Sequence, residues 1–380
     1  MIPITQPLIG EEEAAAAAEV IRSGWLTQGP RTADFERRFA EMVGATHACA
    51  VANCTVALHL ALLGVGVQPG DEVITVSHTF IACANVIRQC GAVPVFVDID
   101  PTTFCMDPAL LERAITPRTR AIMVVHQIGM PADLSRILPI ARAHRIPVVE
   151  DAACALGSEI LLGSAWQPVG MPHGDVACFS LHPRKVVTVG DGGVLTTRDG
   201  DLDRRFRLLR QHGMSVPDTV RHGSRQVIFE SYPVPGFNYR LTDVQAAIGI
   251  EQLKRLPSIV RQRRELAECY ARLLVSEVPE VEAPREPHWA RTNWQSYCVR
   301  LPAGSDQRGV MQHMLDRGVA TRRGIMCIHL EEAYASLPPR FPLPVSEAAQ
   351  RGCVLLPLFP QMTEAMQEKV VVTLREALRA

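Results

Sequence analysis

Short apolar runs recur from residue 47 to residue 197 and are separated by segments with helical spacing. Two of these runs, AIMVV and IPVVE, are almost continuously apolar instead of alternating, which is typical of strands covered by helices on both faces of a mostly parallel sheet. We therefore predict an α/β fold in which a mostly parallel seven-stranded sheet lies between helices. The predicted strands are 47–51, 72–76, 93–97, 121–125, 146–150, 176–180 and 193–197.

Helical patterns precede and follow these strands. Residues 11–22, which include an alanine run, have the composition of a helix. After about residue 240, apolar residues recur at helical spacing, which predicts one long connecting helix with a break near Pro257. The proline-rich remainder predicts a few strands, 296–301 among them, and helices at 305–317 and 363–379.

The length of 380 residues favours two domains over one. We place the boundary near residue 250, with a large α/β domain at 1–250 and a smaller α+β domain at 251–380. Hydrophobic residues make up 47% of the chain and charged residues 21%, as in a globular protein. The formal net charge of -1 provides no overall field that would hold nucleic acid or an anionic membrane, so we expect neither as a partner.

Two features bear on the location of the protein. Residues 45–70 carry no charged side chain and are long enough to cross a bilayer, but they contain polar residues such as Asn53 and His59 and are better explained as a buried strand and a core helix. The start, MIPITQPLIGEEE, lacks the regions of a signal peptide, so we expect a cytoplasmic protein. The eleven cysteines form no CxxC motif and favour buried, reduced thiols over disulfides or a metal site.

Candidate chemistry lies just after the apolar runs, because ligands of open α/β sheets bind outside the carboxyl ends of the strands. Asn53, Cys54 and Thr55 follow the first run and open a helix, where backbone N–H groups favour an anion such as phosphate. A helix N-cap is the simpler explanation for Asn53 or Thr55. The glycine-rich GVGVQPG at 64–70 precedes a strand instead of following one, so we reject it as a dinucleotide loop.

Two ionisable residues at neighbouring strand ends stand out. Asp151 follows the fifth run, and a buried carboxylate there needs a cationic or hydrogen-bonding partner unless it caps the next helix. Lys185 follows the sixth run, just after Ser180 and before the flexible glycines of GDGG at 190–193. A lysine beyond a buried strand end and near Asp151 is a candidate nucleophilic amine.

Several motifs together resemble one known family. The chain resembles the DegT-type sugar aminotransferases, a branch of the fold-type I pyridoxal 5'-phosphate (PLP) enzymes, from residue 24 to residue 357. The motifs are TFIA at 79–82, PVFVDID at 94–100, EDAA at 150–153, FSLHPRK at 179–185, GDGG at 190–193, HG at 212–213 and GFNYR at 236–240.

The resemblance implies a role for individual residues. Lys185 stands where the family has the lysine that binds PLP covalently and moves the proton, and Asp151 stands where a carboxylate pairs with the ring nitrogen. Phe80 stands at the position that stacks on the cofactor ring. The positions that contact the phosphate are those of Cys54, Thr55, Ser180 and, donated by the partner subunit of a homodimer, Asn238.

Two departures from the family pattern concern the cofactor and the substrate. Many relatives have Gln or His at the position of Cys154, which faces the cofactor, and a thiol is a poor hydrogen-bond donor. The segment 320–324 before His329 is unusually rich in arginine. Arg322 and Arg323 are therefore either a clamp for an anionic substrate or part of a solvated turn.

The resemblance implies a PLP-dependent aminotransferase that moves an amino group from glutamate or glutamine to a nucleotide-linked keto sugar. A sugar dehydratase on the same fold is disfavoured, because relatives with that chemistry have histidine where this chain has Lys185. The same chemistry on a non-sugar ketone, such as a cyclitol or an antibiotic precursor, stays open. A protein that binds PLP without chemistry is disfavoured by the intact set of Lys185, Asp151 and Ser180.

Overall fold

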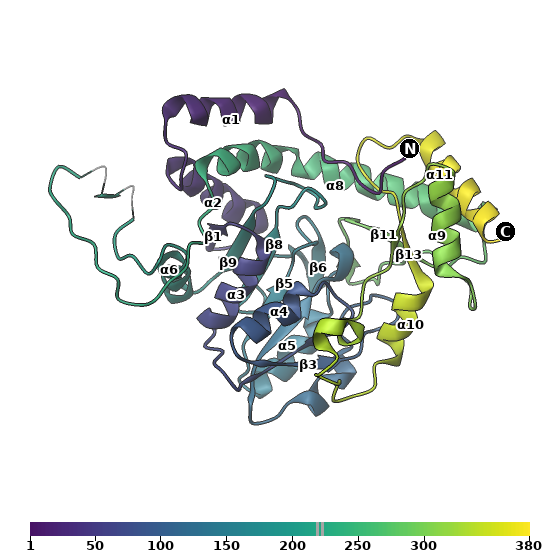
Figure 1. The fold of residues 1–380 in the computed structure, drawn as a ribbon, viewed down its shortest axis with the longest axis horizontal. Helices are drawn as coiled ribbons and strands as arrows, with labels where there is room; N and C mark the ends of the chain where they lie inside the picture. Colours follow the sequence, from purple (N-terminus) through teal and green to yellow (C-terminus); the bar gives the residue numbers. More distant parts are fainter. Residues whose placement is uncertain (218–219, 222–223) are drawn as a thin grey trace.

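In this computed structural model, which describes residues 1–217, 220–221 and 224–380, a seven-stranded sheet has the order β1-β9-β8-β5-β4-β2-β3 (Figure 1). β9 pairs antiparallel with both of its neighbours, and the pairs from β8 to β3 are parallel. The predicted mostly parallel sheet is confirmed. The strands are β1 (His47–Val51), β2 (Glu72–Val76), β3 (Val93–Val97), β4 (Thr119–Val125), β5 (Val148–Asp151), β8 (Val176–Ser180) and β9 (Gly193–Thr197).

The helices around this sheet are α1 (Glu11–Ser23), α2 (Pro30–Val43), α3 (Cys54–Gly64), α4 (Ala82–Gln89), α5 (Leu134–Ala143) and α6 (Gly200–Leu209). Successive side chains of a strand point to opposite faces. In β1, Ala48 and Ala50 accordingly pack with α2, whereas Cys49 and Val51 belong to the core cluster that contains α3 and α6. Burial on both faces explains why the strands read as continuous apolar runs.

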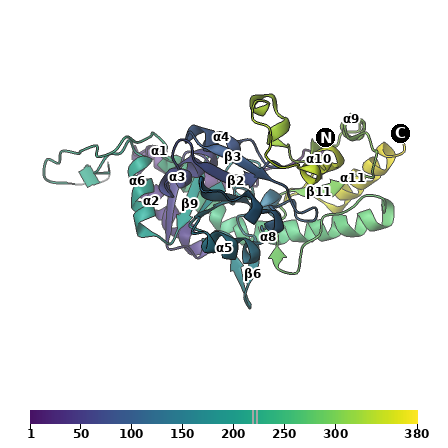
Figure 2. The same ribbon diagram turned by 90° about the horizontal axis from the view of Figure 1, so that it is seen from below.

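A single long helix, α8 (Asp243–Glu277), connects this layer to the C-terminal part of the chain (Figure 2). It begins with a capping box, in which Thr242 and Gln245 satisfy each other's backbone N–H groups. The predicted break near Pro257 is wrong, because α8 continues through this residue. Proline removes one backbone hydrogen bond, but Leu256 and Ile259 on either side are buried in a core cluster with residues of α2, β1 and β8, and this packing maintains the helix.

The C-terminal part contains a three-stranded antiparallel sheet. Its strands, in order, are β11 (Tyr297–Arg300), β13 (Cys353–Leu356) and β12 (Arg322–Arg323). The N-terminus also lies here, because the N–H of Ala320 donates to the carbonyl of Ile2 at 2.9 Å. The predicted boundary near residue 250 falls inside α8, and the division into two domains stays a prediction. The helices of this part are α9 (Gln307–Asp316), α10 (Pro344–Gly352) and α11 (Glu364–Ala377).

Smaller elements complete the described chain. A second three-stranded sheet, which the sequence pattern does not predict, joins β10 (Ala290–Arg291), β6 (Glu159–Leu162) and β7 (Ala165–Pro168). The 3₁₀ helices are Pro108–Leu110, Glu112–Ala114, Gln127–Gly129, Ile328–Leu330 and Glu332–Tyr334. All eleven cysteines are free, and all but Cys154 are buried. Within the described ranges, no helix is both long and apolar enough to span a membrane.

Residues 224–236, which lie between α6 and α8, extend away from the sheet in both views (Figures 1 and 2). We call these residues the arm. Two of its large apolar side chains are almost fully exposed, Val227 at 85% and Phe229 at 90%. Such side chains on an extended segment are typical of a surface that another molecule covers.

Candidate active site

The N-terminus of α3 lies at the carboxyl end of β1. Asn53 is its N-cap, because its Oδ1 accepts a hydrogen bond from the N–H of Val56 at 3.0 Å, which confirms the simpler explanation for this residue. Cys54 and Thr55 occupy the first helical positions, whose N–H groups have no acceptor within a helix and favour an anion. A Cβ on Gly193 would lie 2.4 Å from the backbone of Asn53, so β9 approaches this helix start at a distance that only glycine allows.

Asp151 is the last residue of β5 and is only 5% exposed. Its Oδ1 accepts a hydrogen bond from the N–H of Ala153 at 3.0 Å, and its Oδ2 accepts one from the thiol of Cys83 at 2.9 Å. These donors meet the need of a buried carboxylate for partners. Cys83 is not among the predicted site residues, although the TFIA motif directly precedes it.

Lys185 lies in the loop after β8, and its Nζ donates a hydrogen bond to the Sγ of Cys154 at 3.0 Å. Burial alone lowers the pKa of Lys185, but the sulfur of Cys154 and the carboxylate of Asp151 outweigh burial and raise this pKa above its ordinary value. Burial and then the charge of Asp151 also raise the pKa of Cys54 well above its ordinary value. The structure therefore brings these four predicted residues together at one edge of the sheet.

Two further predicted residues lie at the same edge. Ser180 ends β8, and its Oγ accepts a hydrogen bond from the N–H of His182 at 3.4 Å. Phe80 lies between β2 and α4 and is 62% exposed, so one ring face is open to a planar ligand. An amine, a buried carboxylate, an open aromatic ring and a helix N-terminus are together the donor set that fits PLP.

The family can now be identified from sequence similarity. Residues 7–375 match the sequence profile of the DegT/DnrJ/EryC1/StrS aminotransferase family. The chain belongs to this family. It is therefore an aminotransferase-family enzyme, and the family depends on PLP.

Several solved structures match the whole chain. An aminotransferase, TlmJ, from Streptoalloteichus hindustanus is 37% identical, with a TM-score of 0.90 and coverage of 100% of this chain and 99% of that chain. DesV of S. venezuelae, solved with a ketimine intermediate, is 34% identical, with a TM-score of 0.88 and the same coverage. The putative sugar aminotransferase Spr1654 from Streptococcus pneumoniae, in its PMP form, is 27% identical, with a TM-score of 0.92 and coverage of 100% and 99%. These matches confirm the fold-type I architecture.

The predicted substrate residues lie in different surroundings. The Nδ1 of His329 lies 2.7 Å from the Oγ of Ser77, just beyond β2, so this histidine reaches the edge of the sheet that carries Phe80. Arg322 and Arg323 form the exposed strand β12, and Arg323 forms an ion pair with Glu331 at 3.1 Å. A role of these residues in substrate binding stays a prediction.

Asn238 is exposed and pairs through its backbone with Gln211. The neighbouring carbonyl of Tyr239 accepts a hydrogen bond at 2.8 Å from the N–H of Ala52, which directly precedes the N-cap of α3. The GFNYR motif therefore runs beside the N-terminal end of α3 in its own chain. The predicted contact of Asn238 with the site of a partner subunit is a separate hypothesis, tested below.

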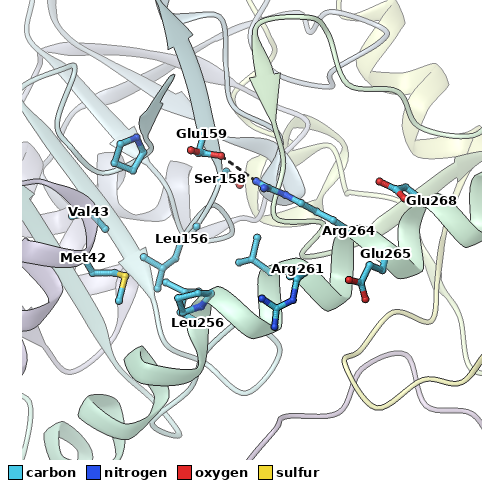
Figure 3. Close-up of a pocket in the computed structure, with 14 residues that line it drawn as sticks. Met42, Val43, Leu156, Ser158, Glu159, Leu256, Arg261, Arg264, Glu265 and Glu268 are labelled. Atoms are coloured by element: carbon cyan, nitrogen blue, oxygen red, sulfur yellow. Dashed lines mark ion pairs between the residues drawn. The ribbon is translucent and has the colours of Figure 1, made fainter. Parts of the chain in front are cut away.

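A cavity of about 490 Å³ lies between the end of α2, the turn at 156–159 and the middle of α8 (Figure 3). None of the predicted site residues lines it. Arg264 of α8 points across this cavity and forms an ion pair with Glu159 at 3.5 Å (Figure 3). The turn on its far side begins at Leu156, two residues after Cys154.

Proposed function

We propose that this DegT-family enzyme transfers an amino group from glutamate or glutamine to a keto sugar linked to a nucleotide, with Lys185 as the residue that binds PLP. The observation that carries the proposal is the position of the Lys185 amine beside Cys154 and near Asp151, in reach of the first turn of α3. Relatives support the substrate class. Spr1654 is described as a putative sugar aminotransferase, and DesI, 29% identical, was solved with its TDP-sugar product.

Each residue of the site has a distinct task in this proposal. The N–H groups of Cys54 and Thr55 and the hydroxyl of Ser180 bind the phosphate of PLP, and Phe80 covers one face of its ring. Asp151 keeps the ring nitrogen protonated, and PLP then supplies an electron sink for the carbon that loses its proton. The amine of Lys185 takes that proton from the donor and returns it to the carbon of the keto sugar.

We also infer that two copies of the chain share their active sites. The exposed apolar side chains Val227 and Phe229 of the arm support a second copy as the surface that covers it. In this arrangement Asn238 of one chain donates to the phosphate bound at α3 of the other. An isologous dimer would use each such contact twice.

Borohydride reduction of the PLP-loaded enzyme should fix the pyridoxyl group on Lys185. The reason is that reduction converts the bond between this amine and PLP into a stable one, so peptide mapping by mass spectrometry locates it. Lys254, which pairs with Glu251 on α8, provides a matched internal control and should stay unlabelled. A label on a lysine other than Lys185 contradicts the assignment.

The substrate class is tested with a panel of ketones. The PMP-loaded enzyme is offered keto sugars linked to different nucleotides, together with cyclitol ketones, and the return of PLP absorbance is recorded. We expect at least one nucleotide-linked keto sugar to restore the absorbance fastest. Restoration by a non-sugar ketone alone would favour the alternative substrate class. If glutamate and glutamine both leave the absorbance of the PLP-loaded enzyme unchanged, aminotransfer from these donors is contradicted.

Arg322→Ala or Arg323→Ala should raise the KM for the keto substrate if the arginine binds its anionic group. Loss of a charge-assisted hydrogen bond of about 1.5–3 kcal/mol corresponds to a roughly 10- to 150-fold change, while the glutamate half-reaction stays nearly intact. Arg317→Ala is a matched control, because Arg317 is also exposed and forms an ion pair, with Glu376. If both variants match this control, the two arginines are only part of a solvated surface.

A further inference from the structure

Residues 292–295 lie between β10 and β11. Two of their side chains reach the site, because Asn293 contacts the backbone segment that carries Cys154 and Gln295 contacts the segment that carries Lys185. We call residues 292–295 the brace. The contacts are hydrogen bonds from brace side chains to backbone carbonyls that are distant in sequence. The inference drawn from them rests on the proposed function, because it assigns the brace a task toward the Lys185 amine.

Asn293 uses the amide nitrogen of its side chain to hold the turn that begins at Cys154. It is fully buried, and its Nδ2 donates to the carbonyl of Cys154 at 2.8 Å and to the carbonyl of Leu156 at 2.9 Å. Its Oδ1 accepts from the N–H of Gln295 at 2.8 Å. If the amide were flipped, its oxygen would face two carbonyl oxygens. The orientation seen in the structure is therefore the one in which every polar group has a partner.

Gln295 holds the peptide unit directly before the side chain of Lys185. Its Nε2 donates to the carbonyl of Arg184 at 2.8 Å, and its Oε1 accepts from the hydroxyl of Ser296 at 2.9 Å. The N–H of the same peptide unit, that of Lys185, donates to the carbonyl of His182 at 2.8 Å. Both polar groups of this peptide unit are therefore fixed, and with them the point from which the lysine side chain extends.

The brace is itself held in a strained shape from the side of α8. Trp294 has a φ of 50°, which is unfavourable for a bulky side chain and persists only where the surroundings impose it. Arg263, which is 1% exposed, donates to the carbonyls of Trp294 at 3.1 Å, Gln295 at 3.3 Å and Leu358 at 3.2 Å. The next residue of α8, Arg264, donates from Nε to the carbonyl of Thr292 at 3.1 Å.

These contacts form one connected unit. Arg263 and Arg264 fix the brace, Asn293 fixes the turn of Cys154, and Gln295 fixes the loop of Lys185. At the far end of the two fixed segments, the Nζ of Lys185 and the Sγ of Cys154 meet at 3.0 Å. We propose that Asn293 and Gln295 are positioning residues, which set the Lys185 amine against Cys154 and so determine how firmly PLP is held and at which pH its bond to Lys185 is protonated.

Gln295→Met tests this proposal, because it keeps the length of the side chain, removes the donor to Arg184 and adds no charge near Lys185. We expect the dissociation constant of PLP, measured by absorbance titration, to rise on the order of tenfold. This is the size of effect expected when one hydrogen bond that holds the Lys185 loop is lost. The pH midpoint of the visible absorbance of the PLP-loaded protein should shift as well. A purely structural residue would lower the melting temperature without moving this midpoint.

Gln307→Met is the matched control. Gln307 is half-buried like Gln295 and also donates from Nε2 to backbone carbonyls, those of Gln350 and Cys353, but it lies in the C-terminal sheet region. We expect this variant to keep the wild-type PLP affinity and pH midpoint. Asn293→Ala leaves two buried carbonyls unpaired and can prevent folding, so Gln295→Met carries the test.

Two results overturn the proposal, and they are distinguishable. If borohydride labels Lys185 in the wild type but Gln295→Met matches Gln307→Met in PLP affinity and pH midpoint, the brace has no positioning role and the proposed function stands. If borohydride labels another lysine in the wild type, the proposed function fails and the role of the brace fails with it.

Discussion

Asp151→Asn should still bind PLP, but its transamination rate should fall about 10³-fold. A loss of this size is expected when a group that stabilises the charge developing in the transition state is removed from an active site. An amide does not provide the negative charge that keeps the ring nitrogen protonated, so the carbon losing its proton has a poorer electron sink. Binding should persist, because the contacts to the phosphate come from α3 and Ser180. Stopped-flow absorbance of the glutamate half-reaction measures the rate, and an absorbance titration measures PLP binding.

Asp98→Asn separates this chemical effect from a cost in folding. Asp98 is also a buried carboxylate just beyond a strand end, and its oxygens accept hydrogen bonds from the N–H groups of Val345 and Ser346 at 2.9 and 2.8 Å. Its replacement should lower the melting temperature and leave the half-reaction rate near that of the wild type. Near-normal turnover in Asp151→Asn would mean that Asp151 only organises the turn at Ala153.

The sheet and its carboxyl edge could be predicted from the sequence because both depend on local patterns. Strands buried on both faces appear as continuous apolar runs, so five of the seven strands have the bounds expected from the sequence and two differ by one or two residues. Polar residues directly after such runs lie at one edge, as Asp151 and Lys185 do. The continuity of α8 through Pro257 could not be predicted, because packing of distant residues decides it.

The contacts that complete the site have no local signal. Cys83 is 68 residues away from Asp151 in the chain, and Asn293 is 139 residues away from Cys154. An isolated Asn or Gln in a short loop is indistinguishable from a solvated residue until the fold gives it buried carbonyls as partners. The strained φ of Trp294 is equally invisible, since sequence preferences alone favour other residues at such a position.

Mixing Lys185→Ala with Asn238→Ala should restore activity if the two residues act at the same site from different chains. The alternative is a contact within one chain, which the hydrogen bond between Tyr239 and Ala52 makes geometrically reasonable. Each variant alone should be inactive or weakly active, because Lys185 moves the proton and Asn238 holds the phosphate. The two alternatives therefore differ in what a mixed dimer contains.

In a mixed dimer with contacts between chains, one site carries both defects and the other carries none. Random exchange makes about half of the dimers mixed, so roughly a quarter of all sites should become fully wild type. With contacts within one chain, every site of the mixed dimer keeps one defect, and activity stays at the average of the two parents. A tag on one variant verifies by co-purification that exchange has occurred, and Asn238→Ala must be clearly impaired alone. With both conditions met, the absence of recovery rejects the shared site, because mixed dimers would then exist without a single intact pair of Lys185 and Asn238.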